Sequence, residues 1–129
     1  MDETDATIAA RRETYRIVSW VILAINLLLL VVIGLVLPGA IAAFRLVFYD
    51  MGRALPTATQ VLMDLTTPMI HAGVGLILLV LTVKEVFAPP KLRFWLNVVN
   101  LLALLLWEAF CVAALFLPML STIHAMQGL

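Results

Sequence analysis

The chain has 129 residues, of which 64% are hydrophobic and 12% are charged, and its formal net charge at pH 7 is zero. Soluble domains contain about 45–50% apolar and about 25% charged residues, and a chain this short has too much surface to hide such an excess of apolar side chains. The composition therefore excludes an ordinary soluble domain and favours a membrane protein. The balanced charge gives no sign of a nucleic-acid partner, and the single cysteine, Cys111, cannot form an internal disulfide.

The first 16 residues are polar and end in a basic group made up of Arg11, Arg12 and Arg16. Basic residues directly before an apolar run meet lipid phosphates, so we expect a short helix at the membrane edge that leads into a first span. Residues 17–37 predict that span, because a crossing needs about 20 residues at a rise of about 1.5 Å each. This apolar run exceeds the ~7–15 residues of a signal-peptide core, so we interpret it as an anchor.

Residues 38–67 make the only long connection between apolar segments. Pro38 and Gly39 are expected to end the first helix. Residues 40–55 then show a helical pattern with an apolar side and a charged side. The residues that mark the two sides are Phe44 and Phe48 on the first and Arg45 and Arg53 on the second. The pattern predicts an amphipathic helix that lies flat in the membrane interface or packs over the ends of the spans.

Later prolines mark the remaining boundaries. Leu55-Pro56-Thr57 has the form of a helix start, and Pro68 is expected to kink or restart the helix. The predicted fold is an all-α integral membrane protein with three transmembrane helices and an amphipathic interfacial helix between the first and the second. Its parts in chain order are an N-terminal segment (1–16), a first span (17–37), a loop with the amphipathic helix and a Leu-Pro-x-x-Thr element (38–67), a second span (68–87), a turn (88–94), a third span (95–120) and a tail (121–129).

Basic residues predict the orientation. The N-terminal segment has three, the second loop has three (Lys84, Lys91 and Arg93), the longer first loop has two, and the tail has none. The positive-inside rule places the N-terminus and the second loop in the cytoplasm. We therefore expect a multi-pass protein of a bacterial inner membrane, with the first loop and the C-terminus in the periplasm.

Glu108 lies near the middle of the third span. A charged carboxylate at that depth costs about 2.5–3.5 kcal/mol on insertion scales, so Glu108 should face a helix or a cavity rather than lipid. At helical spacing it shares one side of the span with Asn97 and Asn100, and Asn26 is the midpoint of the first span. We predict that this polar stripe faces a partner helix or a cavity, and that Asn26 and Glu108 face each other or the same interface.

Two interpretations of Glu108 stay open. The residue is either a protonatable site in a proton or cation path, or a protonated carboxyl that bonds a neighbouring helix in this chain or in a partner. A transport path usually needs several ionisable groups, and apart from Lys84 and Glu85 at the end of the second span, His71 is the only other acidic or basic side chain in these spans. This scarcity favours the second interpretation.

His71 and Asp64 are candidates for the outer face of the membrane. A histidine titrates between pH 5 and 8, but His71 has no nearby His, Cys or Glu at a spacing that would hold a metal. The sequence has no Gly-rich phosphate loop, no Ser/His/Asp set and no paired carboxylates. We therefore predict a non-catalytic protein without a cofactor.

Several short patterns occur together between residue 36 and the end of the third span. They are the exit Val36-Leu37-Pro38, the pair Phe44 and Phe48, the motif formed by Gly52, Leu55, Pro56, Thr59 and Gln60, and the segment Leu117-Pro118-Met119-Leu120. This combination resembles the membrane half of the inner-membrane platform proteins of type II secretion and type IV pilus machines. The resemblance implies a three-span fold with the Leu-Pro-x-x-Thr element outside the cytoplasm. Platform proteins also carry cytoplasmic helical domains that engage an assembly ATPase, which have no counterpart here.

The function expected from these observations is structural. Three short helices with polar groups at mid-depth need partners, so we predict an accessory subunit of a larger membrane assembly. One alternative is a homo-oligomer that conducts protons or cations through Glu108. A further alternative, from the resemblance, is a component of a secretion or pilus platform. The expected partners are the lipid bilayer and other membrane subunits or copies of the same chain.

Overall fold

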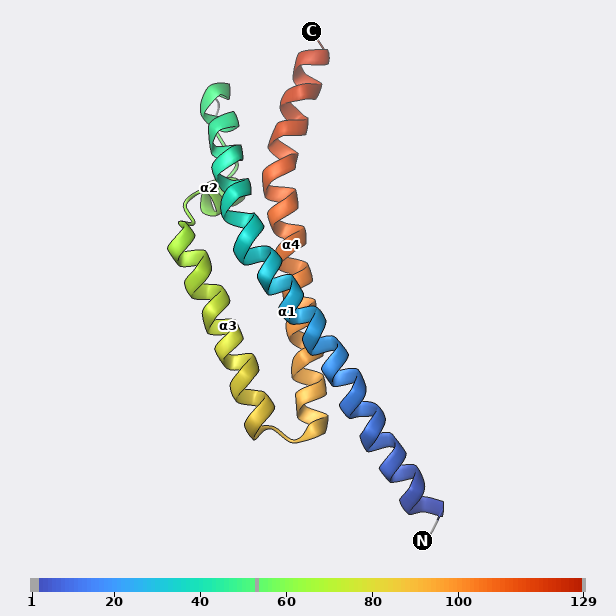
Figure 1. The fold of residues 1–129 in the computed structure, drawn as a ribbon. Helices are drawn as coiled ribbons and strands as arrows, with labels where there is room; N and C mark the ends of the chain where they lie inside the picture. The colour runs from blue at the N-terminus through green and yellow to red at the C-terminus, as the bar shows by residue number, and fades with distance from the viewer. Residues whose placement is uncertain (1–2, 53, 129) are drawn as a thin grey trace.

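The computed structural model of the protein describes residues 3–52 and 54–128. These residues form four helices and no strands, namely α1 (Glu3–Met51), α2 (Thr57–Met63), α3 (Thr67–Phe87) and α4 (Pro90–Gln127). Figure 1 shows the short α2 beside the last part of α1, toward the C-terminal end of the molecule, and the turn between α3 and α4 toward the other end. We call these the α2 end and the turn end. The N-terminal part of α1 projects beyond the turn end, whereas the C-terminus lies at the α2 end (Figure 1).

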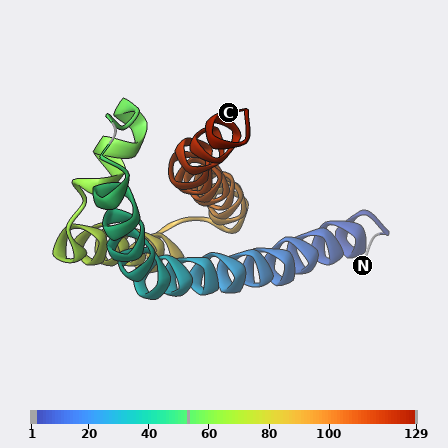
Figure 2. The same ribbon diagram turned by 90° about the horizontal axis from the view of Figure 1, so that it is seen from above.

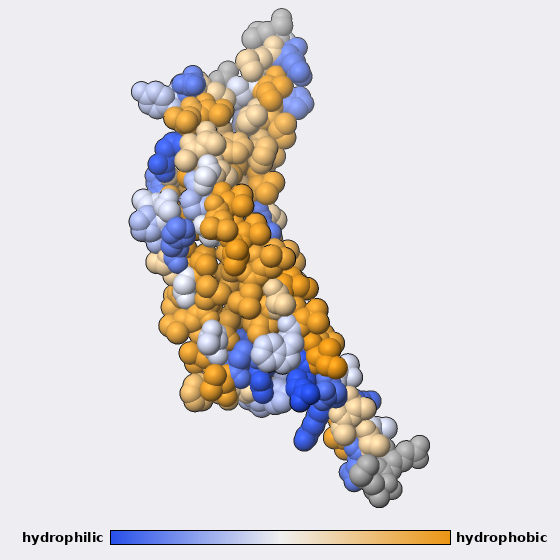
Figure 3. Space-filling model, in the orientation of Figure 1, coloured by the Kyte–Doolittle hydropathy of each residue, from blue (hydrophilic) through white to orange (hydrophobic). Residues whose placement is uncertain are grey.

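The helices α1, α3 and α4 are each long and apolar enough to cross a membrane, which confirms the prediction of an all-α protein with three candidate spans. Figure 3 shows a band of apolar surface between more polar levels at the turn end and near α2. The long helix α1 packs against both α4 and α3, whereas α3 and α4 contact each other only sparsely. The hydrophobic core therefore lies along the side of α1 that faces α3 and α4.

The expectation that Pro38 and Gly39 end the first helix is wrong. The helix α1 continues through Pro38 to Met51, and Gly52 ends it with a φ of 58°. This left-handed conformation suits a glycine after a helix because glycine has no Cβ. A proline inside a helix removes one backbone hydrogen bond and bends the helix rather than always ending it. Figure 2 shows α1 changing direction between its blue and green parts.

The predicted amphipathic segment is the last part of α1 rather than a separate helix. Its apolar side faces protein: Phe48 is buried, and the ring of Phe44 packs edge-on against Phe116 of α4 with 5.1 Å between the ring centroids. Arg45 lies on the exposed side. This segment therefore packs against a neighbouring helix, and its place in the membrane interface stays a prediction. Arg53, the other predicted cation of this face, lies outside the described residues.

Prolines open the helices that follow. Pro56 occupies the N-cap position of α2, and Pro68 lies in the first turn of α3, where its missing N–H would have no helical partner in any case. The helix α4 begins at Pro90 and continues through Pro118 to Gln127. The tail expected from residue 121 onward is therefore helical as far as Gln127.

Candidate functional site: a polar network between the helices

Asn97 joins the three long helices at the turn end. Its side chain is fully buried, and its Nδ2 atom donates to the Ser19 carbonyl at 3.2 Å and to the Ser19 hydroxyl at 3.0 Å on α1. The same Nδ2 atom lies 3.3 Å from Oε1 of Glu85 on α3. The Asn97 Oδ1 atom accepts a hydrogen bond from Lys84 on α3. One amide on α4 thus binds both other helices.

Asn26 extends this network along α1. Its side chain is 0% exposed, its Nδ2 atom donates to the Asn97 carbonyl at 3.0 Å, and its Oδ1 atom accepts from Asn100 Nδ2 at 3.2 Å. Side-chain amides between transmembrane helices satisfy one another because lipid offers no alternative donor or acceptor. Asn26 and Asn100 therefore fix the position of α1 against α4.

Three charged side chains complete the network at the turn end. Glu85 accepts from Lys84 Nζ at 2.7 Å, and its other oxygen lies 3.7 Å from Arg93 Nη1. Lys84 is only 8% exposed, although the sequence placed it among the cations of a solvent-facing loop. Burial of these charges is tolerated because a carboxylate lies between two cations and an amide oxygen accepts from the ammonium group.

The prolines inside α1 and α4 leave backbone carbonyls that two remote side chains bind. A proline at position i cannot donate to the carbonyl of residue i−4, so Pro38 frees Gly34 and Pro118 frees Ala114. The Nε2 atom of His71 lies 3.0 Å from the Gly34 oxygen. The Thr59 hydroxyl donates to the Ala114 oxygen at 2.7 Å. Thr59 of α2 and His71 near the start of α3 therefore bind the carbonyls that the two prolines free.

Glu108 lies outside the polar network. Its side chain is half-buried, and it has no hydrogen-bond partner within the described part of the chain. Asn26 and Glu108 do not face each other, because Asn26 binds Asn97 and Asn100, and Glu108 lies about 12 Å further along α4 than Asn100 at a rise of about 1.5 Å per residue. The alternative, that both residues face the same interface, stays a prediction. The midpoint of residues 17–37 was a poor guide to depth because α1 continues beyond Pro38.

The predicted outer-face residues Asp64 and His71 lie at the α2 end, together with His124. Asp64 is exposed at the C-terminus of α2, and His124 is exposed near the end of α4, where its ring contacts the Leu120 carbonyl at 2.8 Å. The ring of His71 contacts the carbonyl oxygen of Gly34. Within residues 3–52 and 54–128, no three His, Cys, Asp or Glu side chains lie close enough together to hold a metal ion.

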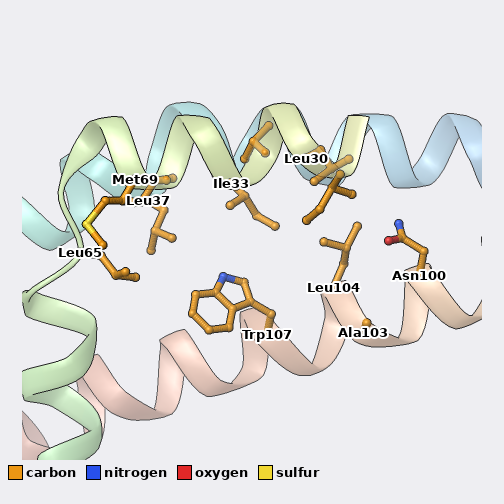
Figure 4. A pocket seen from close by; sticks show the side chains of 13 residues that line it. Leu30, Ile33, Leu37, Leu65, Met69, Asn100, Ala103, Leu104 and Trp107 are labelled. Carbon is orange, nitrogen blue, oxygen red and sulfur yellow. The ribbon is translucent and has the colours of Figure 1, made fainter. Parts of the chain in front are cut away.

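A cleft of about 370 Å³ opens between α1, α3 and α4 next to the network. Figure 4 shows the indole ring of Trp107 across the cleft from the side chains of α1, with Asn100 at one end and Leu65 and Met69 at the other. The lining is apolar apart from Asn100 and the Trp107 N–H. Glu108 does not line it, because Glu108 lies on the opposite side of Leu104 from Ala103 and Trp107 at 100° per residue.

The hydrogen bonds and ion pairs between the helices involve five residues that the sequence did not single out as sites. They are Ser19, Thr59, Lys84, Glu85 and Asn97. Two signals could have identified some of them. A proline inside an apolar run indicates a free carbonyl four residues earlier, and a threonine or histidine elsewhere at similar depth is a candidate donor. Asn97 already lay on the polar stripe of the third span, but its several partners depend on how the helices cross.

Comparisons with protein-family models, with curated proteins and with solved structures give no match to this chain.

Proposed function

We propose that this chain is a non-catalytic structural subunit of a larger membrane protein assembly. The observation that supports this function is the place of Glu108. It lies about 16 Å beyond Asn97 and about 15 Å before Pro118 along α4, deep in the apolar band, at a rise of about 1.5 Å per residue. A carboxyl group there needs a hydrogen-bond partner, and the described residues supply none. A helix of another subunit would supply it.

The sparse packing of α3 also supports association. Only Ile70, Leu81 and Lys84 are buried among its 21 residues. Ala72 is exposed, and a small residue on a transmembrane helix lets a second helix approach closely. Most of the surface of α3 is therefore free to contact a partner subunit.

Conduction through a single chain has less support. Leu30, which is 0% exposed, and Leu104, which is 5% exposed, lie between the polar network and the depth of Glu108. Such an apolar layer interrupts a path for protons or cations, which need successive polar or water-filled sites. A path between copies of the chain would require Glu108 residues from several copies to form a ring.

One contact favours a second candidate function, that of a component of a secretion or pilus platform. Thr59 belongs to the Leu-Pro-x-x-Thr element, and Pro118 belongs to the Leu-Pro segment at the end of the third span. The Thr59 hydroxyl binds the carbonyl that Pro118 frees, so two of the patterns that resemble platform proteins meet. The contact therefore explains why the two patterns occur together in one chain.

We propose a location in a bacterial inner membrane with the turn end in the cytoplasm. Six basic residues lie on the segments at that end: Arg11, Arg12, Arg16, Lys84, Lys91 and Arg93. Figure 3 shows strongly polar side chains gathered there. The positive-inside rule assigns such an end to the cytoplasm.

Native mass spectrometry after gentle extraction from the source membrane tests the structural function. We expect the 14.2 kDa chain to leave the membrane with larger, different subunits. The Glu108→Gln variant keeps a hydrogen-bonding side chain and should stay in the complex. The Glu108→Leu variant lacks one and should dissociate from the partner subunits. Leu106→Ala is the matched control, because Leu106 is exposed at nearly the same depth.

A closed ring of identical chains would overturn the proposal. If proton or cation flux then fell on Glu108→Gln in reconstituted vesicles, conduction would replace the structural function. Recovery of subunits of a pilus or secretion machine would select the second candidate.

A further inference from the structure

The cleft between α1, α3 and α4 is an apolar groove of about 370 Å³. It extends along Leu30–Leu37 of α1 and along the facing parts of α3 and α4, which is about 11 Å at a rise of about 1.5 Å per residue.

A hydrocarbon chain can lie along a cleft of this length and volume, because carbon atoms pack at about 4 Å from their neighbours. The walls are almost wholly apolar, and the cleft lies within the apolar band of the molecule. Empty space there would deprive the side chains that line it of contacts that a lipid chain can supply.

The end of the cleft at Leu65 adjoins a more polar groove. Leu65 lines both the cleft and this groove, whose other lining residues include Arg45, Thr66 and Thr67. The guanidinium of Arg45 donates to the Met63 carbonyl through Nη2, which leaves further N–H groups for a second acceptor. A cation and two hydroxyl groups beside the mouth of an apolar cleft complement the phosphate of a lipid.

We propose that the protein binds one phospholipid, with an acyl chain in the cleft beside Trp107 and the phosphate at Arg45. Arg45 lies eight residues beyond Leu37 along α1, about 12 Å at a rise of about 1.5 Å per residue. The whole site, from Arg45 to Leu30, covers about 22 Å, somewhat more than the roughly 15 Å of hydrocarbon in one leaflet. This length places the phosphate just outside the hydrocarbon when the end of the acyl chain at Leu30 reaches the bilayer midplane. The proposal is independent of any partner subunit.

Two glycines of α3 give a matched pair of test variants. Gly73 lines the cleft, and a Cβ added there meets nothing within 4 Å, so Gly73→Leu fills the cleft without a backbone clash. Gly75 does not line the cleft, and an added Cβ there also meets nothing within 4 Å. Both substitutions replace a helical glycine by leucine and change helix propensity equally. Any difference between them reports on the cleft.

Native mass spectrometry of the full chain, purified in detergent and supplied with phosphatidylglycerol, tests retention of the lipid. Wild type and Gly75→Leu should carry one tightly held lipid, and Gly73→Leu should lose at least tenfold in occupancy. Arg45→Gln should lower retention of phosphatidylglycerol severalfold. Equal retention by the two glycine variants would overturn the proposal. So would a dimer of the chain that disappears only in Gly73→Leu.

Fluorescence locates the chain of the lipid. Trp20 and Trp95 are more than half exposed, so Trp20→Phe and Trp95→Phe together should leave Trp107 as the only tryptophan without disturbing the core. In vesicles of phosphatidylglycerol with brominated chains, Trp107 should be quenched strongly, and Gly73→Leu should roughly halve the quenching. Equal quenching in the Gly73→Leu and Gly75→Leu proteins would place the lipid outside the cleft and contradict the proposal.

Discussion

The Nε2 atom of His71 lies 3.0 Å from the carbonyl oxygen of Gly34, the oxygen that Pro38 deprives of its helical donor. Thr59 binds the Ala114 oxygen in the same relation to the proline of α4. Thr59 lies on α2, in the segment that connects α1 to α3, whereas His71 lies near the start of α3. Because lipid contains no water to bind a free carbonyl, a kinked span needs such a donor from protein. Thr59 of α2 and His71 of α3 therefore supply the donors that the two helical prolines lack.

A double-mutant cycle tests the first of these contacts. His71→Leu should cost about 1 kcal/mol of unfolding free energy, the usual size of a hydrogen bond between transmembrane segments, as measured by unfolding in mixed micelles. In a Pro38→Ala background residue 38 donates to Gly34 again, so the cost of His71→Leu should largely vanish. An equal cost in both backgrounds would show that His71 stabilises the protein by some other contact.

The second contact has its own matched control. Thr59 is 1% exposed, and Thr59→Val keeps the shape of the side chain while leaving the Ala114 oxygen without a donor. We expect a loss of about 1–2 kcal/mol in the same unfolding assay. Thr57→Val, at an exposed position of α2, should change stability by less than about 0.5 kcal/mol. Similar losses of stability for the two variants would contradict the proposal that Thr59 stabilises the fold by binding the carbonyl that Pro118 frees.

Asn97 should be the most sensitive residue of the polar network. Asn97→Leu removes the acceptor of Lys84 and the donor to Ser19, so a buried cation keeps only Glu85 as a partner. A loss of about 3 kcal/mol is expected, because breaking a buried charged network leaves uncompensated groups. Asn100→Leu removes one bond of a half-buried side chain and should cost about 1 kcal/mol. The reverse order would contradict the central place of Asn97.

Part of the fold could be predicted from the sequence because hydropathy acts locally. Three apolar runs predict three helices, and Pro68 in the first turn of α3 follows from the missing proline N–H. The prediction that Pro38 ends the first helix failed because local rules do not include distant partners. The carbonyl that Pro38 frees contacts His71, which is 33 positions away in the chain.

The candidate site was harder to predict for the same reason. Asn26 and Asn100 were expected between helices, but their pairing depends on the crossing of α1 and α4. Lys84 is a charged residue at the end of a span, where a solvent-exposed side chain is expected. It is buried because Glu85 and Asn97 bind its ammonium group. Charge alone does not distinguish a solvated cation from a paired one.

The orientation across the membrane gives a final prediction. Cys111 is buried and is the only cysteine, so Cys111→Ala provides a background without thiols. Ala6 and Ala125 are exposed at opposite ends of the molecule. In intact cells a membrane-impermeant maleimide should label Ala125→Cys and should leave Ala6→Cys unlabelled until the cells are opened. The physical reason is that the basic residues of the turn end favour the cytoplasmic side. Labelling of Ala6→Cys in intact cells, with Ala125→Cys protected, would reverse the orientation and place the proposed phospholipid in the cytoplasmic leaflet.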